Sequence, residues 1–151
     1  MEGRQSSNLR VEHAFEAVQY RVYPETPLTE VIDLMVRRAA HAIPVVGEQY
    51  EVLGIITTGD ALKRVLREGP GEDDEGRENR DVQTARDIMT RAVLCVSETQ
   101  PLMDAARMMM NRDVEQLPVV RDGELIGLIT RDAVLSALHG NRDDQDEREE
   151  D

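Results

Sequence analysis

The sequence contains one pattern twice, and this internal repeat limits the folds open to the chain more than any other feature. The stretch GIITTGDAL at residues 54–62 is repeated as GLITRDAV at 127–134. Upstream, Val22 aligns with Val96 at an offset of 74 residues. After the PVV of each copy the offset becomes 73, because the first copy has a longer loop there. The chain therefore holds two similar units.

Each copy predicts the order strand, helix, strand, strand, helix. A short apolar strand (QYRVY or VLCVS) leads to Pro27 or Pro101 at the first helical position. A strand containing proline (AIPVV or QLPVV), a polar hairpin, a further strand (VLGIIT or LIGLIT) and a last helix complete the copy. Because neither copy has much against which to bury its strands, we expect an α/β module of two copies packed sheet to sheet with pseudo-two-fold symmetry.

An apolar stripe predicts that the first helix of each copy has one face in the core. Its residues recur at helical spacing. They are Leu28, Val31, Ile32 and Met35 in the first copy, and Leu102, Ala105, Ala106 and Met109 in the second.

Length and apolar runs limit the class of protein. The 151 residues suffice for one compact domain or for two half-domains that share a core. No run of eighteen apolar residues and no charged-then-apolar leader occur, so we expect a cytoplasmic protein without a membrane span. The single cysteine, Cys95, excludes an internal disulfide framework and a cysteine metal cage, and its apolar run predicts a buried strand position.

Charge and motif content argue against two broad functions. The 31 acidic residues against 18 basic ones give a net charge of −13, which repels the phosphate backbone of nucleic acids. The three histidines and the cysteine form no zinc or nucleophile motif, and no glycine-rich phosphate loop of the P-loop kind is present. We therefore expect no nucleic-acid binding, no metal site and no enzyme activity.

Composition divides the chain into four parts. We assign the first repeat to residues 10–68 and the second repeat to 82–140. Between them, residues 69–81 are rich in glycine and acidic residues, which is typical of a solvated linker. Residues 141–151 are a run of charges with nothing to bury, and we expect a disordered acidic tail there.

Two β-α-β-β-α copies, each with PVV before a hairpin and G-apolar-apolar-T before a last helix, resemble a tandem pair of CBS domains (cystathionine β-synthase domains, the Bateman module). DIMT at residues 87–90, followed by an apolar strand, resembles the start of a second CBS repeat. The resemblance covers residues 10–140 and depends on the order and doubled spacing of the motifs, since no single motif is specific. It implies a regulatory module, not an enzyme, that needs no cofactor and binds an adenosine-containing effector (AMP, ADP, ATP, S-adenosylmethionine or sometimes NAD) in clefts between the repeats. It also implies a homodimer that signals to a separate effector protein.

The first repeat carries a candidate ligand site where its last strand meets its last helix. Thr57 ends the strand and Asp60 follows three residues later, so a hydroxyl and a carboxylate lie at a helix N-terminus that favours an anion. The resemblance implies that Asp60 holds the ribose and Thr57 the phosphate or its bridging water. The alternative is that the two side chains only cap the helix, and both roles are compatible.

The second repeat departs from this pattern. Thr130 matches Thr57, but Ala133 stands at the position of Asp60, and Asp132 falls one residue early. Such a shift at a helix start turns a side chain by about 100°. Either the turn is shorter and Asp132 still reaches the ribose, or this site has lost its carboxylate and binds weakly or not at all. We expect asymmetry, with the Asp60 site the stronger one.

The implied fold adds other residues around the two sites. His41 is either a phosphate partner or an exposed loop histidine, and Arg131 is either a phosphate partner or only solvated. Glu115 argues against a polyphosphate in the second site. Further lining residues are expected beside the PVV motifs (Ala42, Ile43, Gln116, Leu117) and beside the base (Tyr20, Val22, Val96, Ser97).

The main rival function is a dimerising adaptor that binds another protein without a small ligand. A subunit interface is suggested by Met108, Met109 and Met110, of which only Met109 belongs to the core stripe. Met108 and Met110 cannot both share its face, so we expect at least one of them at an interface between subunits.

Overall fold

The computed structural model describes residues 8–68, 83–91 and 93–150, with the backbone alone for residues 68 and 141–150. These residues form two compact units, and each is described by itself. The first-repeat unit extends from Gln19 to Val93, and the second-repeat unit combines the residues up to Val18 with those from Leu94 onward. The units therefore divide the chain differently from the sequence ranges 10–68 and 82–140. The linker predicted at 69–81 lies outside the described residues.

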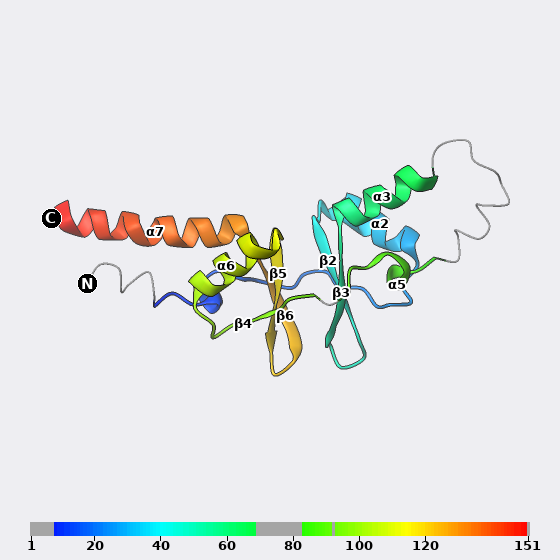
Figure 1. The fold of residues 1–151 in the computed structure, drawn as a ribbon, viewed down its shortest axis with the longest axis horizontal. Coiled ribbons are helices and arrows are strands. Elements are labelled where there is room, and N and C mark those ends of the chain that lie inside the picture. The colour runs from blue at the N-terminus through cyan, green and yellow to red at the C-terminus, as the bar shows by residue number, and fades with distance from the viewer. Residues whose placement is uncertain (1–7, 69–82, 92, 151) are drawn as a thin grey trace. The chain divides into compact units, whose positions relative to one another are not determined.

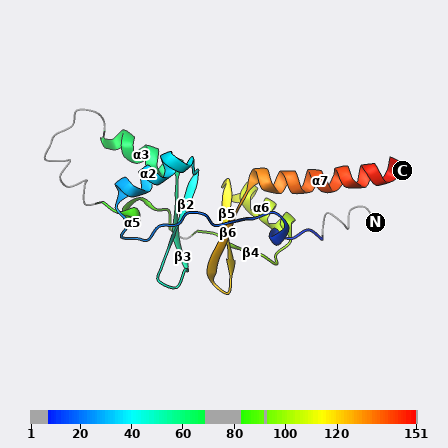
Figure 2. The same cartoon turned by 180° about the vertical axis from the view of Figure 1, so that it is seen from behind.

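The first-repeat unit is an antiparallel hairpin with helices to one side of it (Figures 1 and 2). Its elements are α2 (Leu28–Arg38), β2 (Ala42–Val46), β3 (Val52–Thr57), α3 (Thr58–Glu68) and the short α5 (Ala85–Ile88). The strand predicted at 19–23 is reduced to one parallel bridge between Val22 and Val45. Pro24, two residues later, has no N–H with which to extend this pairing.

The predicted apolar stripe of α2 is confirmed. Leu28, Val31 and Met35 are buried, and Ile32 packs against the same core. Pro27 is the N-cap residue, so the helix begins one position later than the sequence predicts. The other buried members of this core are Val22, Ile43, Val45, Ile56, Ala61 and Ala85.

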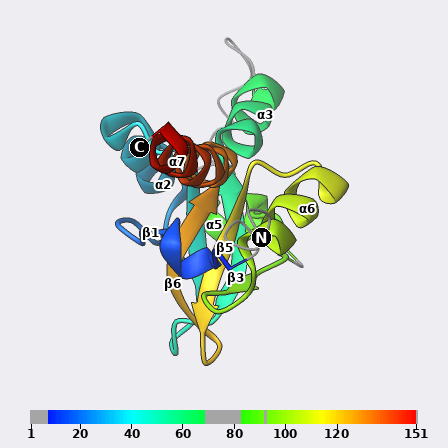
Figure 3. The ribbon, with the colours of Figure 1, turned by 90° about the vertical axis from the view of Figure 1, so that its left-hand side faces the viewer.

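The second-repeat unit contains a four-stranded sheet in the order β1-β6-β5-β4. Its elements are the 3-10 turn η1 (Val11–His13), β1 (Glu16–Ala17), β4 (Val96–Ser97), α6 (Leu102–Arg112), β5 (Gln116–Arg121), β6 (Glu124–Thr130) and α7 (Arg131–Glu150). Only β4 and β5 run parallel. Figure 3 shows β1 beside β6. Leu102, Ala105 and Met109 of the α6 stripe are buried in the core of this unit, as predicted.

The end of the chain differs from the sequence prediction. We expected a disordered tail at 141–151, but the backbone of α7 continues to Glu150. Residues 141–150 contain neither proline nor glycine, so no residue in this stretch removes a helical hydrogen bond or adds the flexibility of glycine. Within the described ranges, α7 included, no helix combines the length and the apolar character needed to cross a membrane.

Cys95 lies one residue before β4 and is half-buried, less than the sequence predicts. Burial raises the pKa of its thiol, because the charged thiolate is poorly solvated there. The thiol therefore remains protonated at neutral pH.

In each unit a short segment pairs with one edge of the last strand, and the two pairings are equivalent. In the first-repeat unit Thr90 pairs with Ile55 of β3 through two backbone hydrogen bonds, of 2.8 and 3.0 Å. In the second-repeat unit Glu16 of β1 lies opposite Leu128 of β6. Ile55 and Leu128 are equivalent in the repeat, and so are Thr90 and Glu16. The segment that precedes each repeat in sequence thus belongs to the other unit.

This edge pairing requires a glycine in each strand. A Cβ on Gly54 would lie 2.7 Å from Met89 Sδ and 2.8 Å from the Thr90 carbonyl oxygen. A Cβ on Gly127 would overlap the Glu16 carbonyl oxygen and the ring of Phe15. These atoms belong to the paired backbone and its flanking side chains, so they cannot move away without weakening the pairing.

We predict that Gly127→Ala lowers the free energy of unfolding by about 1–3 kcal/mol, because the added methyl overlaps the backbone of β1. Urea unfolding followed by circular dichroism measures this change. Gly140→Ala is the matched control: among the described residues, its chain neighbours and the backbone of its own helix aside, no atom lies within 4 Å of the place its methyl would occupy, and alanine favours a helix over glycine by about 1 kcal/mol. Equal stability of Gly127→Ala and the wild type would contradict the account of the edge.

Candidate functional site

Thr57 and Asp60 hold each other at the start of α3. The Asp60 N–H donates to Thr57 Oγ1 at 3.2 Å, and the Thr57 N–H donates to Asp60 Oδ2 at 3.0 Å. This reciprocal arrangement is a capping box, so the capping role considered in the sequence analysis is present. It fixes both side chains at the end of the helix where backbone N–H groups favour negative charge.

The capping role uses only one oxygen of the Asp60 carboxylate. Thr90 Oγ1 also donates to Oδ2, at 3.3 Å, and among the described residues no donor is hydrogen-bonded to Oδ1. The side chain is half-buried, so its position is defined while one oxygen stays accessible. A carboxylate held in this way accepts hydrogen bonds from neutral hydroxyl groups.

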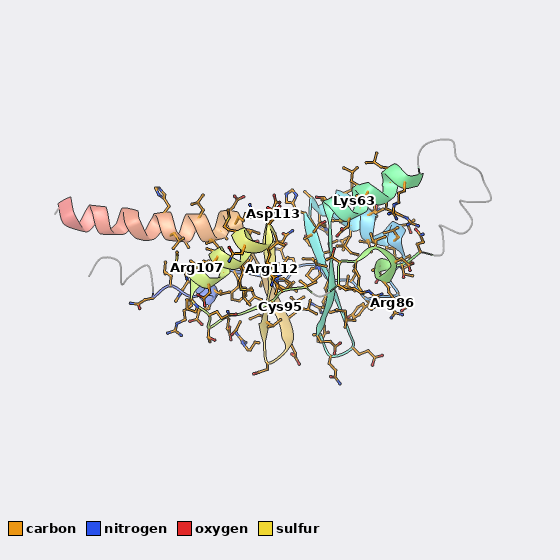
Figure 4. All side chains as sticks on the ribbon, in the orientation of Figure 1. Lys63, Arg86, Cys95, Arg107, Arg112 and Asp113 are labelled. Atoms are coloured by element: carbon orange, nitrogen blue, oxygen red, sulfur yellow. The ribbon has the colours of Figure 1, made fainter. Side chains whose placement is uncertain are left out.

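A cationic groove lies beside Asp60. It has a volume of about 170 Å³ and is lined by Asp60, Lys63, Arg64, Arg67, Asp87 and Ile88. Figure 4 shows Lys63, the one lysine of the chain, on α3. Three cationic side chains next to an acceptor carboxylate suit a ligand that carries both hydroxyl groups and an anion.

A larger groove, of about 390 Å³, runs along α2 and does not include Asp60. Most of its charged side chains engage one another or aromatic rings. Arg37 pairs with Asp33 at 3.1 Å, and the Arg21 guanidinium lies 4.6 Å from the centre of the Tyr50 ring. We take the smaller groove as the site, because it joins an accessible carboxylate oxygen to a helix N-terminus.

The other predicted residues of the first repeat fall into two groups. His41 is exposed, and its carbonyl oxygen accepts the Thr58 N–H at 3.0 Å, which places its backbone at the start of α3. Ala42 pairs with Thr57 in the hairpin. Ile43 and Val22, in contrast, are core residues, with 0% and 5% of their surface exposed. The half-buried Tyr20 lies under the Arg38 guanidinium, whose carbon is 5.8 Å from the ring centre.

The helix start of the second repeat has the same backbone geometry without the carboxylate. The Ala133 N–H donates to Thr130 Oγ1 at 3.1 Å, which repeats the bond from Asp60 to Thr57. The turn is therefore not shortened, and that alternative is wrong. Asp132 is exposed at the preceding helical position and does not take the place of Asp60.

Arg131 has a role that neither sequence interpretation anticipated. Its Nε donates to the Val114 carbonyl oxygen at 3.0 Å, and its Nη2 donates to the Met109 carbonyl oxygen at 3.2 Å. Nη2 also lies 3.4 Å from Oδ1 of Asp113, which Figure 4 labels at the end of α6. The guanidinium thus satisfies carbonyls at the C-terminus of α6. The one sequence feature that could have indicated this role is the lack of a glycine at the end of α6. Asp113 adopts the left-handed conformation there, where a glycine is usual.

The remaining predicted residues of the second repeat form the sheet and its core. Gln116 lies opposite Thr130 in the β5–β6 pairing, and the exposed Glu115 accepts the Arg131 N–H through its carbonyl oxygen. Leu117 and Val96 are buried in the core. Ser97 is half-buried, and its N–H donates to the Gln100 side chain at 2.7 Å.

Comparison with known proteins finds the same repeat. The family model of the CBS domain matches residues 20–67 and 85–140. A relative from Methanopyrus kandleri, described only as uncharacterized, is 30% identical over 124 residues, which cover 80% of this chain and 59% of that protein. The chain thus spans about three-fifths of that relative's length.

Solved structures agree in fold. The crystal structure of CBSX2 in complex with AMP superposes with a TM-score of 0.75 at 26% identity, covering 88% of this chain and 98% of that one. The CBS domain pair of protein MJ0100, in complex with 5′-methylthioadenosine and S-adenosyl-L-methionine, gives a TM-score of 0.69 at 23% identity over 89% and 98% of the two chains. Both superpositions confirm the predicted α/β fold of β-α-β-β-α repeats.

We predict that Arg131→Ala lowers the free energy of unfolding by about 1–3 kcal/mol, because it leaves carbonyl groups at the end of α6 without their charged donor. Thermal unfolding measures the loss. Arg107→Ala is the matched control, since its ion pair with Asp104 is exposed and contributes about 0–1 kcal/mol. A loss in Arg131→Ala no larger than in the control would show that the guanidinium is not a helix cap.

Proposed function

The chain belongs to the CBS domain family, and on this premise we propose that it is a regulatory module that binds an adenosine-containing ligand, with AMP as the first candidate. The observation that carries the proposal is the Asp60 carboxylate, held by Thr57 and Thr90 through Oδ2 while Oδ1 remains accessible. In this proposal the Asp60 carboxylate accepts hydrogen bonds from the ribose hydroxyls. Thr57 and the N-terminus of α3 face the phosphate.

Charge supports a nucleotide with at least one phosphate at this site. The chain as a whole carries −13, yet the groove beside Asp60 contains three cationic side chains. The local positive charge lowers the electrostatic free energy of bringing an anion to a protein that is acidic overall. The complex of CBSX2 with AMP supports the same ligand class. ADP, ATP, S-adenosylmethionine and NAD remain alternatives to be compared directly with AMP.

The proposal gives the chain a regulatory role, not a catalytic one. Ligand occupancy at the start of α3 would be passed to a separate effector protein. Ligand binding can shift the module between two conformational states only if the affinity for the ligand differs between those states. The rival proposal, an adaptor without a small ligand, predicts no nucleotide binding at all.

Exposed apolar side chains on the helices support a homodimer. Val36 of α2 is 75% exposed and Leu66 of α3 is 72% exposed in the first-repeat unit, and Met110 of α6 is 67% exposed in the second. Met108 is half-buried against the core, so Met110 is the methionine available for an interface. Large apolar side chains exposed on surface helices are typical of interfaces between subunits.

We predict that Asp60→Ala weakens AMP binding about 10- to 100-fold, because hydrogen bonds to a charged group contribute about 1.5–3 kcal/mol. Isothermal titration calorimetry measures the affinity, and a melting curve shows whether the variant still folds. Asp33→Ala is the matched control, since this exposed aspartate on α2 pairs only with Arg37 among the described residues.

The ligand offers a second control for the same experiment. AMP without its 2′- and 3′-hydroxyls should bind the wild type as weakly as AMP binds Asp60→Ala. If the wild type binds none of AMP, ADP, ATP, S-adenosylmethionine or NAD, the adaptor replaces the sensor. If AMP binds equally well to Asp60→Ala, the site lies elsewhere.

We predict that light scattering gives the wild type twice the mass of the 17.0 kDa chain and that Leu66→Glu shifts it toward the monomer. The introduced carboxylate would have to be buried without a partner, which is costly at an apolar interface. Glu48→Ala, an exposed position in the hairpin, should remain dimeric. A monomeric wild type at high protein concentration would contradict the homodimer.

A further inference from the structure

The cationic groove beside Asp60 contains a second carboxylate, which the proposed function leaves without a role. Asp87 and Ile88 of α5 line the groove together with Asp60 and the three cationic side chains of α3. The described lining residues therefore include three cationic and two acidic side chains, which leaves one net positive charge. Since Asp60 is assigned to the ribose, Asp87 is the acidic group that remains to face the phosphate end of a ligand.

The backbone around α5 fixes the position of the Asp87 carboxylate. Asp87 Oδ2 accepts the Thr84 N–H at 2.8 Å, in the capping box that starts α5. The helix is itself anchored, because the Ala85 N–H donates to the Thr26 carbonyl oxygen at 2.9 Å and Ala85 is fully buried. The carboxylate therefore cannot move away from the groove without breaking the cap of α5.

The cap of α5 does not require a negative charge. The repeat equivalent of Asp87 is His13, which lies in η1 of the second-repeat unit. There the Arg10 N–H donates to His13 Nδ1 at 2.9 Å, as the Thr84 N–H donates to Asp87. A ring nitrogen thus caps the equivalent turn in the same way as a carboxylate oxygen. Capping explains why an acceptor stands at position 87, but it does not explain the charge.

The charge of Asp87 is also not used in an ion pair across the groove. Among the residues that the structure describes, Asp87 forms no ion pair with Lys63 or Arg67, although all three line the same groove. Asp87 is exposed, and the hydrogen bonds from Thr84 both end on Oδ2. Oδ1 and the charge of the carboxylate therefore act on whatever enters the groove.

We infer that Asp87 is a specificity-determining residue of this site, which makes the groove favour an adenosine ligand with one phosphate over a ligand with a chain of phosphates. The inference rests on the proposed function, because it concerns the ligand whose ribose Asp60 holds. It assigns to the Asp87 carboxylate the task of limiting the negative charge that the groove accepts.

Electrostatic repulsion gives the physical reason for this selection. AMP carries about two negative charges at neutral pH, and ATP carries about two more. One net positive charge in the groove offsets part of the charge of AMP but leaves most of the charge of ATP unbalanced. A fixed carboxylate repels the more highly charged ligand more strongly. Asp87 therefore raises the free energy of the ATP complex more than that of the AMP complex.

The test compares the affinities of the full chain for AMP and for ATP by isothermal titration calorimetry, without divalent cations. We expect the wild type to bind AMP more tightly than ATP. Asp87→Asn should raise the affinity for ATP about 3- to 10-fold and the affinity for AMP less, so the preference for AMP falls. The change should shrink in molar KCl, because salt screens charges at an exposed site.

Two further variants separate the charge of Asp87 from its role in capping. Asp87→His keeps a capping acceptor, as His13 does in the second-repeat unit, and should shift the two affinities in the same direction as Asp87→Asn. Asp33→Asn removes one negative charge from α2, outside the groove, and should leave the ratio of the two affinities unchanged. Melting curves of all three variants show whether each one folds.

The inference is overturned if the wild type prefers ATP, if Asp87→Asn leaves the ratio unchanged, or if Asp33→Asn changes the ratio equally. Each of these results leaves the proposed function standing, provided that binding still depends on Asp60. If the wild type binds neither nucleotide, nor any other adenosine-containing ligand, the proposed function fails and the inference fails with it. The two failures are therefore distinguished by the wild-type titrations alone.

Discussion

The pairing of an edge residue with the last strand of each unit is the interaction on which the rest of the structure depends. Thr90 pairs with Ile55 of β3, and Glu16 pairs with Leu128 of β6. Each pairing covers a strand edge that would otherwise present unpaired backbone groups. Because the pairing segment precedes the other repeat in sequence, neither repeat completes its own unit. In the first-repeat unit the same pairing brings Thr90 to Asp60 at the helix start, so it joins the fold to the candidate site.

The helix starts of the two repeats differ mainly in charge, although their backbone hydrogen bonds are alike. In the first repeat a half-buried carboxylate lies beside three cationic side chains. In the second repeat Ala133 stands at the position of the aspartate, and the cations are replaced by small residues. Such substitutions change the local charge without altering the hydrogen bonds that start the helix, since those involve Thr57 or Thr130 and backbone N–H groups. One duplicated scaffold therefore carries different charges at its two helix starts.

The sequence predicts the repeat, the order of its elements and the core stripes of α2 and α6, because apolar periodicity and proline positions act locally. It also predicts the proximity of Thr57 and Asp60, which are three residues apart. The edge pairings join residues 35 and more than 100 positions apart, so local patterns do not reveal them. For the same reason the sequence did not predict the contact of Thr90 with Asp60 or the capping of α6 by Arg131.

The central claim is that the start of α3 binds an adenosine-containing ligand. A two-dimensional ¹H–¹⁵N NMR titration with AMP tests it most directly, since it locates the ligand without a substitution. The account predicts that the largest shifts arise at the amides of Thr57, Asp60 and Thr90. Shifts confined to the larger groove along α2, at Asp33 and Arg37 for example, with none at the three predicted amides, would contradict it.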